Sequence, residues 1–319
     1  MVSYLEKFRY GLHSGINKGW YGFLWMLKII LPISFLAVLI EYSGWMHKLD
    51  FFLAPAMNLL SLPPAAALPL IVGMLTGIYG GIAAMMIFPL TNNEMTLIAI
   101  FLLISHNLIQ EGIIQGKSGL NPIKATLFRL TASSITVMIV AKLLGPEPAG
   151  ILGKSASIAG HAPLLIMVKS WFTDTLFLSA KIFVIIMVIM ILLEMMKAFN
   201  MIHHIVRILR PILKTMGLNQ VVGLLWLTAV IFGIAYGGAV IVEETKQGYI
   251  KKEELEKLHL SIGINHSMVE DPALFLSLGL SAFWLWVPRL ILAIVAVRLL
   301  GIYYKLKSKL SVSICARKL

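Results

Sequence analysis

Long apolar runs, separated by short polar segments that are often basic, make up most of the chain. A bilayer crossing takes roughly 20 predominantly apolar residues. Six runs are long enough, and they cover residues from about 22 to 45, 95 to 111, 122 to 145, 176 to 198, 257 to 281 and 283 to 303. The fifth run contains a break near residue 270. The pattern predicts an all-α polytopic membrane protein with six spanning helices.

The composition supports this class and excludes several others. Hydrophobic residues make up 59% of the chain and charged residues 13%, whereas soluble domains are roughly half apolar and a quarter charged. The net charge of +12 comes from short basic loops rather than from one soluble face, so we interpret it as a topology signal and expect no nucleic-acid partner. Cys315 is the sole cysteine, which excludes an internal disulfide or a multi-thiolate metal site. No cofactor is expected.

Two further apolar stretches, residues 63–90 and 219–242, are interrupted by glycine. Lysine and arginine in short loops prefer the cytoplasmic side of the membrane. Most of the basic loops lie on that one side only if both stretches enter and leave the membrane on the same side, so we predict that both are re-entrant hairpins. Backbone that leaves the helix in hydrocarbon survives only where it faces protein or a wet cavity. We therefore assign the glycine motifs to a substrate site, with tight helix packing as the alternative. The motif residues are Gly77, Tyr79, Gly80, Gly81, Tyr236, Gly237 and Gly238.

Two polar motifs, "ISHNLIQEG" at 104–112 and "INHSMVEDP" at 264–272, interrupt spans. An ionisable side chain at the bilayer centre costs about 2.5 to 3.5 kcal/mol, which favours binding over an idle role. Gly112 and Pro272 predict a helix break at the end of each motif, and helix capping at wet span ends is the alternative. The candidate substrate ligands are His106, Asn107, Gln110, Glu111, Asn265, His266, Ser267, Glu270 and Asp271. As an alternative, a divalent metal would use His106, Glu111, His266, Glu270 and Asp271.

The two halves of the chain repeat the same order of elements. A separation of 160 residues relates His106 to His266 and Arg129 to Arg289, and either arginine could pair with the acids of the motifs. We expect each repeat to contain three crossings, a re-entrant hairpin and a surface helix, at about 49 to 61 in the first repeat and 201 to 216 in the second. Because three crossings are an odd number, the second repeat is inverted relative to the first, as in many secondary transporters. The expected division is an interfacial amphipathic helix at 1–21, repeat 1 at 22–146, an extracytoplasmic connector at 147–175, repeat 2 at 176–303 and a basic cytoplasmic tail at 304–319.

The stretch "LPISFLAVLIEYSGWMHKLDFFLAPAMNLLSLP", the following "GIYGG" and the two polar motifs resemble the Gate-domain, or "nucleoside recognition", family. The resemblance covers nearly the whole chain as two Gate units. Its relatives include the spore maturation proteins A and B, the membrane region of ferrous iron transporter B and, remotely, the concentrative nucleoside transporters. It implies that Gln110, Glu111, Glu270 and Asp271 are solute ligands, and that the protein lies in the bacterial cytoplasmic (inner) membrane.

The leading hypothesis is a secondary transporter of a small polar solute, nucleoside-like or an anionic metabolite, that works by alternating access at a midplane site. Protons are the simplest coupling ion, because histidines and carboxylates carry the motifs. Two alternatives are a divalent metal transporter and a non-transport scaffold of an envelope or sporulation complex. We expect no enzyme, since no nucleophile is evident. The expected partners are the solute, the lipid bilayer and a coupling proton or cation, with homo-oligomerisation left open. Both termini are expected in the cytoplasm.

Overall fold

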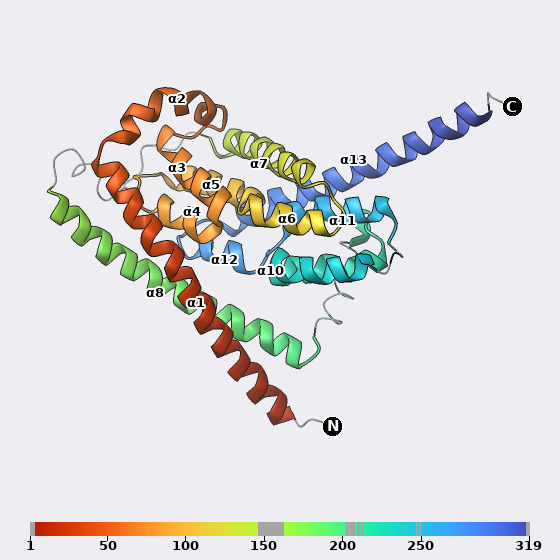
Figure 1. Ribbon diagram of the computed structural model, residues 1–319, viewed down its shortest axis with the longest axis horizontal. Coiled ribbons are helices and arrows are strands. Elements are labelled where there is room, and N and C mark those ends of the chain that lie inside the picture. Colours follow the sequence, from red (N-terminus) through yellow and green to blue (C-terminus); the bar gives the residue numbers. More distant parts are fainter. Residues whose placement is uncertain are drawn as a thin grey trace.

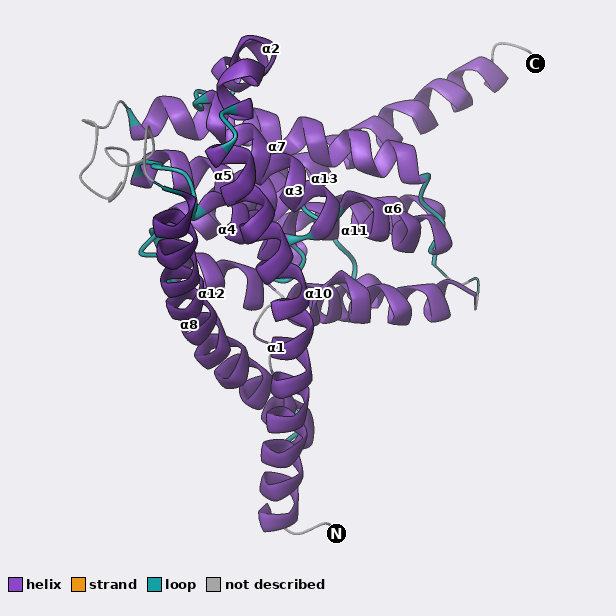
Figure 2. Cartoon of the chain, turned by 60° about the vertical axis from the view of Figure 1, so that its left-hand side comes forward, coloured by secondary structure: helices purple, strands orange, loops and turns teal. Residues whose placement is uncertain are grey.

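The computed structural model is helical throughout the part of the chain that it describes, which is residues 4–145, 163–201, 204, 208, 211, 213–246, 248 and 250–316. Figure 1 shows the order of the helices and Figure 2 shows that helices and loops make up these residues, with no strand among them. The elements are α1 (Tyr4–Tyr42), α2 (Trp45–Leu59), the 3₁₀ helix η1 (Pro64–Ala66), α3 (Ala67–Thr76), α4 (Ile78–Met85), α5 (Asn92–Ser105), α6 (Leu108–Lys117), α7 (Pro122–Leu144), α8 (Leu164–Ala198), α10 (Gln220–Lys246), α11 (Lys252–Asn265), α12 (Glu270–Leu276) and α13 (Ala282–Ala316).

Five segments within the described residues are long and apolar enough to cross a membrane. They are Tyr4–Tyr42, Asn92–Lys117, Pro122–Leu144, Leu164–Ala198 and Ala282–Lys309. The chain is therefore a multi-pass α-helical membrane protein, as expected. The sixth expected span, at 257–281, corresponds to α11 and α12. It fails the same test because α11 has only 14 residues and opens with Glu253 and Glu254.

Helices α1 and α8 pack along one another in opposite directions. The glycines at positions 11, 15 and 19 of α1 are buried. A Cβ atom added to Gly15 would lie 2.5 Å from the Cα of Ile191, and one added to Gly19 would lie 2.6 Å from the Sδ of Met187. Residue numbers thus rise along α1 while they fall along α8, so the pair is antiparallel (Figure 1). Small residues allow such close approach between membrane helices.

Each glycine-broken stretch folds back on itself at a glycine. Gly77 separates α3 from α4 with φ 97° and ψ −177°, and Gly233 interrupts α10 with φ 76° and ψ 170°. Only glycine adopts such angles readily. A Cβ atom on Gly81 would lie 3.3 Å from the Cα of Gly73, and one on Gly237 would lie 2.4 Å from the Cα of Ala229. Contact between residues four before and four after the break requires a hairpin.

The helix limits differ from the expected division in three places. The expected interfacial helix at 1–21 is not a separate element, because α1 runs unbroken from Tyr4. Much of the expected connector is helical, since α8 starts at Leu164 in a stretch that holds no internal proline or glycine. The expected tail at 304–319 continues α13 as far as Ala316, because its lysines and leucines are good helix formers. Helix α2 covers most of the stretch at 49 to 61 that was expected to form a surface helix, whereas most of residues 202–212 lie outside the described residues.

Candidate functional site

Both polar motifs contain a helix break, and each break is held against a hairpin. Asn107 and Ser267 have positive φ angles of 50° and 48°, a conformation that polar residues tolerate better than most. The backbone N–H of Asn107 donates to the carbonyl of Gly73 at 3.0 Å, and that of Ser267 donates to the carbonyl of Ala229 at 3.2 Å. The two motifs therefore repeat the same contact with the first arm of their hairpins.

The breaks come earlier than Gly112 and Pro272 predicted. Gly112 lies inside α6, where its Cα faces Thr126 and Pro122, and glycine inside a helix is unfavourable by only about 1 kcal/mol. Pro272 lies in the first turn of α12, where a proline loses no helical hydrogen bond. The expectation that these two residues end the helices was thus incorrect.

A buried arginine supports each break from a neighbouring helix. Arg129 in α7 donates from Nε to the carbonyl of Ile104 at 2.7 Å and from Nη2 to the carbonyl of His106 at 2.8 Å. Arg289 in α13 makes the same two bonds, to Ile264 and His266, both at 3.0 Å. These arginines satisfy carbonyl groups that the broken helices leave unpaired.

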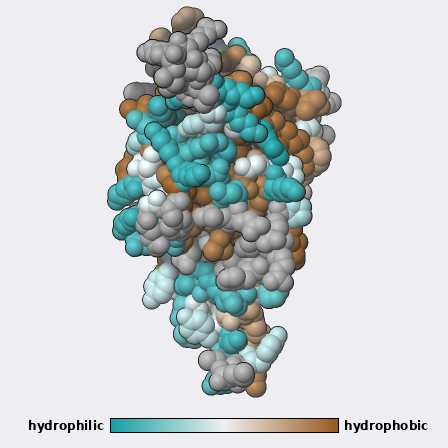
Figure 3. Space-filling view, turned by 90° about the vertical axis from the view of Figure 1, so that its right-hand side faces the viewer, coloured by the Kyte–Doolittle hydropathy of each residue, from teal (hydrophilic) through white to brown (hydrophobic). Residues whose placement is uncertain are grey.

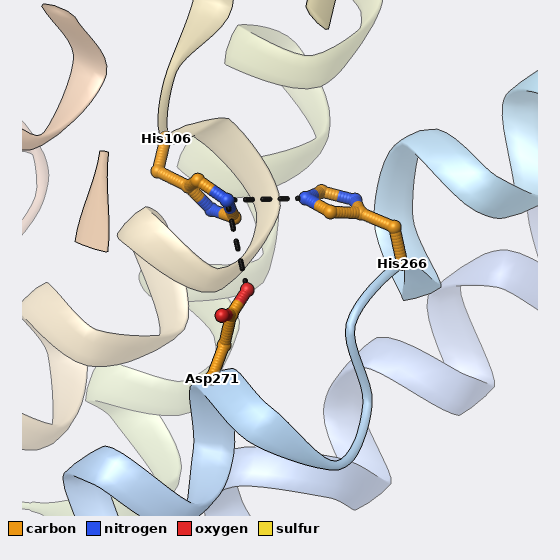
Figure 4. A group of neighbouring side chains, drawn as sticks. All are labelled: His106, His266 and Asp271. Carbon is orange, nitrogen blue, oxygen red and sulfur yellow. Dashed lines mark hydrogen bonds and ion pairs between the residues drawn. The ribbon is translucent and has the colours of Figure 1, made fainter. Parts of the chain in front are cut away.

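The two histidines of the motifs meet in the centre of the molecule. The Nε2 atoms of His106 and His266 lie 3.3 Å apart, and Oε1 of Glu111 lies 3.1 Å from the first and 3.2 Å from the second. Asp271 approaches His106 with Oδ2 at 3.6 Å from Nε2. Figure 4 shows how His106, His266 and Asp271 point toward one another from three different segments. We call His106, His266, Glu111 and Asp271 the histidine cluster.

The outer ring nitrogens fix the tautomers of both histidines. Nδ1 of His106 lies 2.8 Å from the carbonyl of Leu102, and Nδ1 of His266 lies 2.9 Å from the carbonyl of Ile262. A carbonyl oxygen only accepts hydrogen bonds, so each Nδ1 carries a proton. In the neutral rings the Nε2 lone pairs then face each other and the carboxylate of Glu111. Such a group of acceptors holds together only around a cation, which is a proton or a metal ion.

The two halves differ in their ion pairs. Nη1 of Arg129 pairs with Oε2 of Glu111 at 2.7 Å. The equivalent residues of the second half, Arg289 and Asp271, make no ion pair with each other within 4.0 Å among the described residues. Nη1 of Arg289 and Oδ2 of Asp271 are buried and have no hydrogen-bond partner there. The shorter aspartate side chain accounts for the difference.

The other polar candidates lie around the cluster and not in it. Glu270 accepts a hydrogen bond at 2.6 Å from the hydroxyl of Tyr79, which comes from the first hairpin. Asn107 donates to the amide oxygen of Gln110 at 2.8 Å, and this pair is more exposed than the cluster. The side chain of Asn265 is fully buried without a partner among the described residues.

The glycine motifs have two roles in the structure. Gly77 makes the first break, but Gly80 and Gly81 lie inside α4, where added Cβ atoms would come within 2.0 and 2.5 Å of other side chains. Gly237 and Gly238 are likewise buried in the second arm of their hairpin, and the second break falls at Gly233, which the motif did not indicate. The close contacts of Gly80, Gly81 and Gly237 agree with the packing interpretation, and the assignment of the glycine motifs to a substrate site stays a prediction. The side chain of Tyr236 lies outside the described residues.

Sequence reasoning missed a second polar group between α6 and α11. Ser118 Oγ lies 3.1 Å from Nε2 of His259, and Gln115 donates to the carbonyl of His259 at 3.4 Å. Each of these side chains is about 1% exposed. The helical spacing of Gln115 and Ser118 from Glu111 was visible in the sequence, but their pairing with His259, which lies 144 and 141 positions away, was not.

Comparison with known proteins places part of the chain in a family. Residues 23–147 match the family model described as Gate, nucleoside recognition. The chain is also similar to the uncharacterized membrane protein YvoD of Bacillus subtilis (strain 168), with 24% identity over 286 residues, which covers 89% of this chain and 90% of that protein. No solved structure matches the chain. The second Gate unit, at 176–303, stays a prediction. The chain is thus a multi-pass membrane protein in which residues 23–147 match the Gate, or nucleoside recognition, domain.

Proposed function

We propose that the protein is a membrane transporter whose cargo is a divalent transition-metal ion bound by the histidine cluster. One observation carries this proposal: two imidazole Nε2 atoms and two carboxylate oxygens converge at separations of 3.1, 3.2, 3.3 and 3.6 Å. Zinc bonds to nitrogen and oxygen at about 2.0 to 2.2 Å in tetrahedral geometry, which separates the ligand atoms by about 3.3 to 3.6 Å. The distances of 3.3 and 3.6 Å lie in this range, and those from Glu111 are slightly shorter. One donor atom each of His106, His266 and Asp271 lies within 4.8 Å of the others, so these three residues could hold a small cation with Glu111 beside them.

The same distances argue against a larger solute inside the cluster. Side chains that already lie within hydrogen-bonding distance of one another leave no room for a sugar or a base between them. Histidine with carboxylate ligands suits zinc, iron and manganese. The proton on each Nδ1 is held by a backbone carbonyl, an outer interaction that orients metal-binding histidines in many proteins.

The transport part of the proposal is supported by the arrangement of the halves. Helices α1 and α8 occupy the same place in the two repeats and run antiparallel, which supports inverted repeats with the cluster between them. In this mechanism the cluster binds the ion, and movement of one half against the other exposes it to either side in turn. The basic loops favour an inner-membrane protein with both termini in the cytoplasm.

A metal-binding experiment tests the proposal. Purified protein is titrated with Zn²⁺, Mn²⁺ or Fe²⁺ by calorimetry, and one bound ion per chain is expected. The double variant His106→Ala, His266→Ala should bind none, whereas His13→Ala, which removes an exposed histidine of α1, should bind normally. Because the ion displaces protons from its ligands, the affinity should fall as the pH is lowered. Purified wild-type protein that binds no metal in any of these titrations would overturn the proposal.

A second candidate is a secondary transporter of a small polar solute, coupled to protons. The amide pair of Asn107 and Gln110 favours it, because it lies at the break beside Gly77 and is more exposed than the cluster. The histidine cluster would then hold the coupling proton, and Glu270 and Asp271 would serve as further acids. Nucleoside or anionic-metabolite uptake into proteoliposomes, abolished by Gln110→Ala and with no metal uptake, would select this candidate over the first.

A further inference from the structure

The polar group of Gln115, Ser118 and His259 continues the histidine cluster along one side. Glu111 and Gln115 on α6 and its C-cap residue Ser118 are spaced by four and three residues, so their side chains lie on one side of that helix. His259 precedes His266 by seven residues, two turns along α11. A polar stripe therefore runs from the cluster toward the end of α6 at Lys117 and the start of α11 at Lys252. We call Gln115, Ser118, His259 and Gly263 the polar stripe.

Two atoms of the polar stripe lack partners. Oε1 of Gln115 and Nδ1 of His259 are buried and accept or donate no hydrogen bond among the described residues. Buried polar atoms without a protein partner are unfavourable unless water satisfies them. Gly263 lies between Arg129 and Gln115, with its Cβ position 3.5 Å from Cγ of Arg129 and 3.6 Å from Nε2 of Gln115. The unpaired atoms of Gln115 and His259 are the ones that water would satisfy in a hydrated passage.

The equivalent positions in the other half are apolar. At the separation of 160 residues, Gln115 and Ser118 correspond to Phe275 and Leu278, and His259 and Gly263 correspond to Ala99 and Leu103. Phe275, Ala99 and Leu103 are completely buried in the hydrophobic core, and Leu278 packs against that core. We call these four residues the apolar plug. No polar side chain continues from the cluster through these four positions.

The polar stripe leads to a hydrophilic face of the molecule. Its outer end is the region of α6 and α11 that holds the exposed residues Lys117, Lys251 and Lys252. Figure 1 places the ends of these helices on the right, and Figure 3, which shows that side, has hydrophilic residues over much of its centre. Because the halves are inverted in the proposed function, the apolar plug faces the other side of the membrane.

We propose that the polar stripe is the hydrated route by which a small cation travels between the histidine cluster and the face that carries Lys117 and Lys251, while the apolar plug closes the opposite route. The proposal rests on the proposed function for the identity of the cation. Whether water reaches the polar stripe can be tested without any transported ion.

Thiol accessibility tests the route at matched positions. In a Cys315→Ser background, which lacks the sole native thiol, the substitutions Gln115→Cys and Phe275→Cys place thiols at equivalent sites on the two sides of the cluster. Ser118→Cys and Leu278→Cys form a second pair, in which Ser118→Cys changes the side chain least. Vesicles of known orientation are treated from one side at a time with a charged, membrane-impermeant thiol reagent, and total thiol is counted after denaturation.

The thiols from Gln115→Cys and Ser118→Cys should react from the side of Lys117, roughly tenfold or more faster than those from Phe275→Cys and Leu278→Cys, because only a hydrated thiol ionises and reacts with such a reagent. Equal rates within both pairs, or reaction at Phe275→Cys alone, would overturn the proposal. Variants are compared only if they elute as folded protein, and two independent pairs protect against the loss of one. A normal accessibility pattern in protein that binds no metal would leave the route standing and remove the metal proposal.

Discussion

The ion pair between Glu111 and Arg129 gives a sharp prediction about stability. In Glu111→Gln the side chain keeps its size and loses its charge. Glu111 is 2% exposed and Arg129 is 1% exposed at the side chain, and the pair is 2.7 Å long. The substitution leaves the Arg129 guanidinium buried without a counter-ion. It also replaces one of the two carboxylate oxygens, which lie near Arg129 and the two histidines, with an amide NH2 that only donates hydrogen bonds.

Removing one partner of a buried ion pair typically destabilises a protein by about 3 to 5 kcal/mol. The second half of the chain provides the matched control, Asp271→Asn. Asp271 makes no ion pair with Arg289 among the described residues, and its nearest ring nitrogen, on His106, is 3.6 Å away. Neutralising a buried carboxylate that is poorly paired also removes its desolvation penalty, so the control should be neutral or slightly stabilising.

The assay is thermal unfolding of the purified proteins in one detergent with a metal chelator, followed by circular dichroism at one heating rate. Glu111→Gln should lower the Tm by several degrees more than Asp271→Asn does, since roughly 2 to 4 °C accompanies each kcal/mol in domains of moderate size. Equal Tm values for the two variants would refute the reasoning, because the ion pair between Glu111 and Arg129 would then add no more stability than the poorly paired Asp271 does.

Three further predictions concern the backbone and the helix packing. Gly77→Ala should destabilise the protein by about 1 to 3 kcal/mol, because φ 97° and ψ −177° strain any residue other than glycine. Gly44→Ala, at φ 68° and ψ 9°, should lose less stability, and chemical unfolding of the two variants measures the difference. Gly15→Leu should separate α1 from α8, since its Cβ would lie 2.5 Å from the Cα of Ile191, and a double-cysteine cross-link across these helices should form more slowly. Thr91→Ala removes the capping box of α5 and should cost about 1 kcal/mol, seen as faster hydrogen exchange confined to the first turn of α5.

The polar motifs were predictable because their cost in hydrocarbon is high. His106, Glu111, His266 and Asp271 stand out in apolar runs, and the structure brings these four together. The separation of 160 residues also indicated that Arg129 and Arg289 play matching roles, and their matching bonds to the carbonyls at the breaks agree with this. Ionisable side chains that recur at matching depths in both halves of a membrane chain are informative, because chance alone rarely places so costly a group twice.

The exact breaks and the second polar group were not predictable. A glycine or proline signals where a helix can end, but the helices end at His106 and His266, where an arginine from another helix donates hydrogen bonds to the loose carbonyls. Gly233 could not be chosen over Gly237 from the sequence, since both glycines lie in the same apolar stretch, 219–242. The contact of His259 with Ser118 depends on the packing of α11 against α6, which local patterns do not contain.

The contact between α1 and α8 has a consequence for joining the two halves in one chain. The first helix of each half finds its closest partner in the first helix of the other half, and a row of glycines matches one to the other. In the proposed inverted-repeat arrangement, a separate half would leave that row uncovered and would have to pair with a second, oppositely inserted copy. Fusing the halves into one polypeptide fixes their stoichiometry at one to one. It also frees each half to differ, as glutamate at 111 and aspartate at 271 already do.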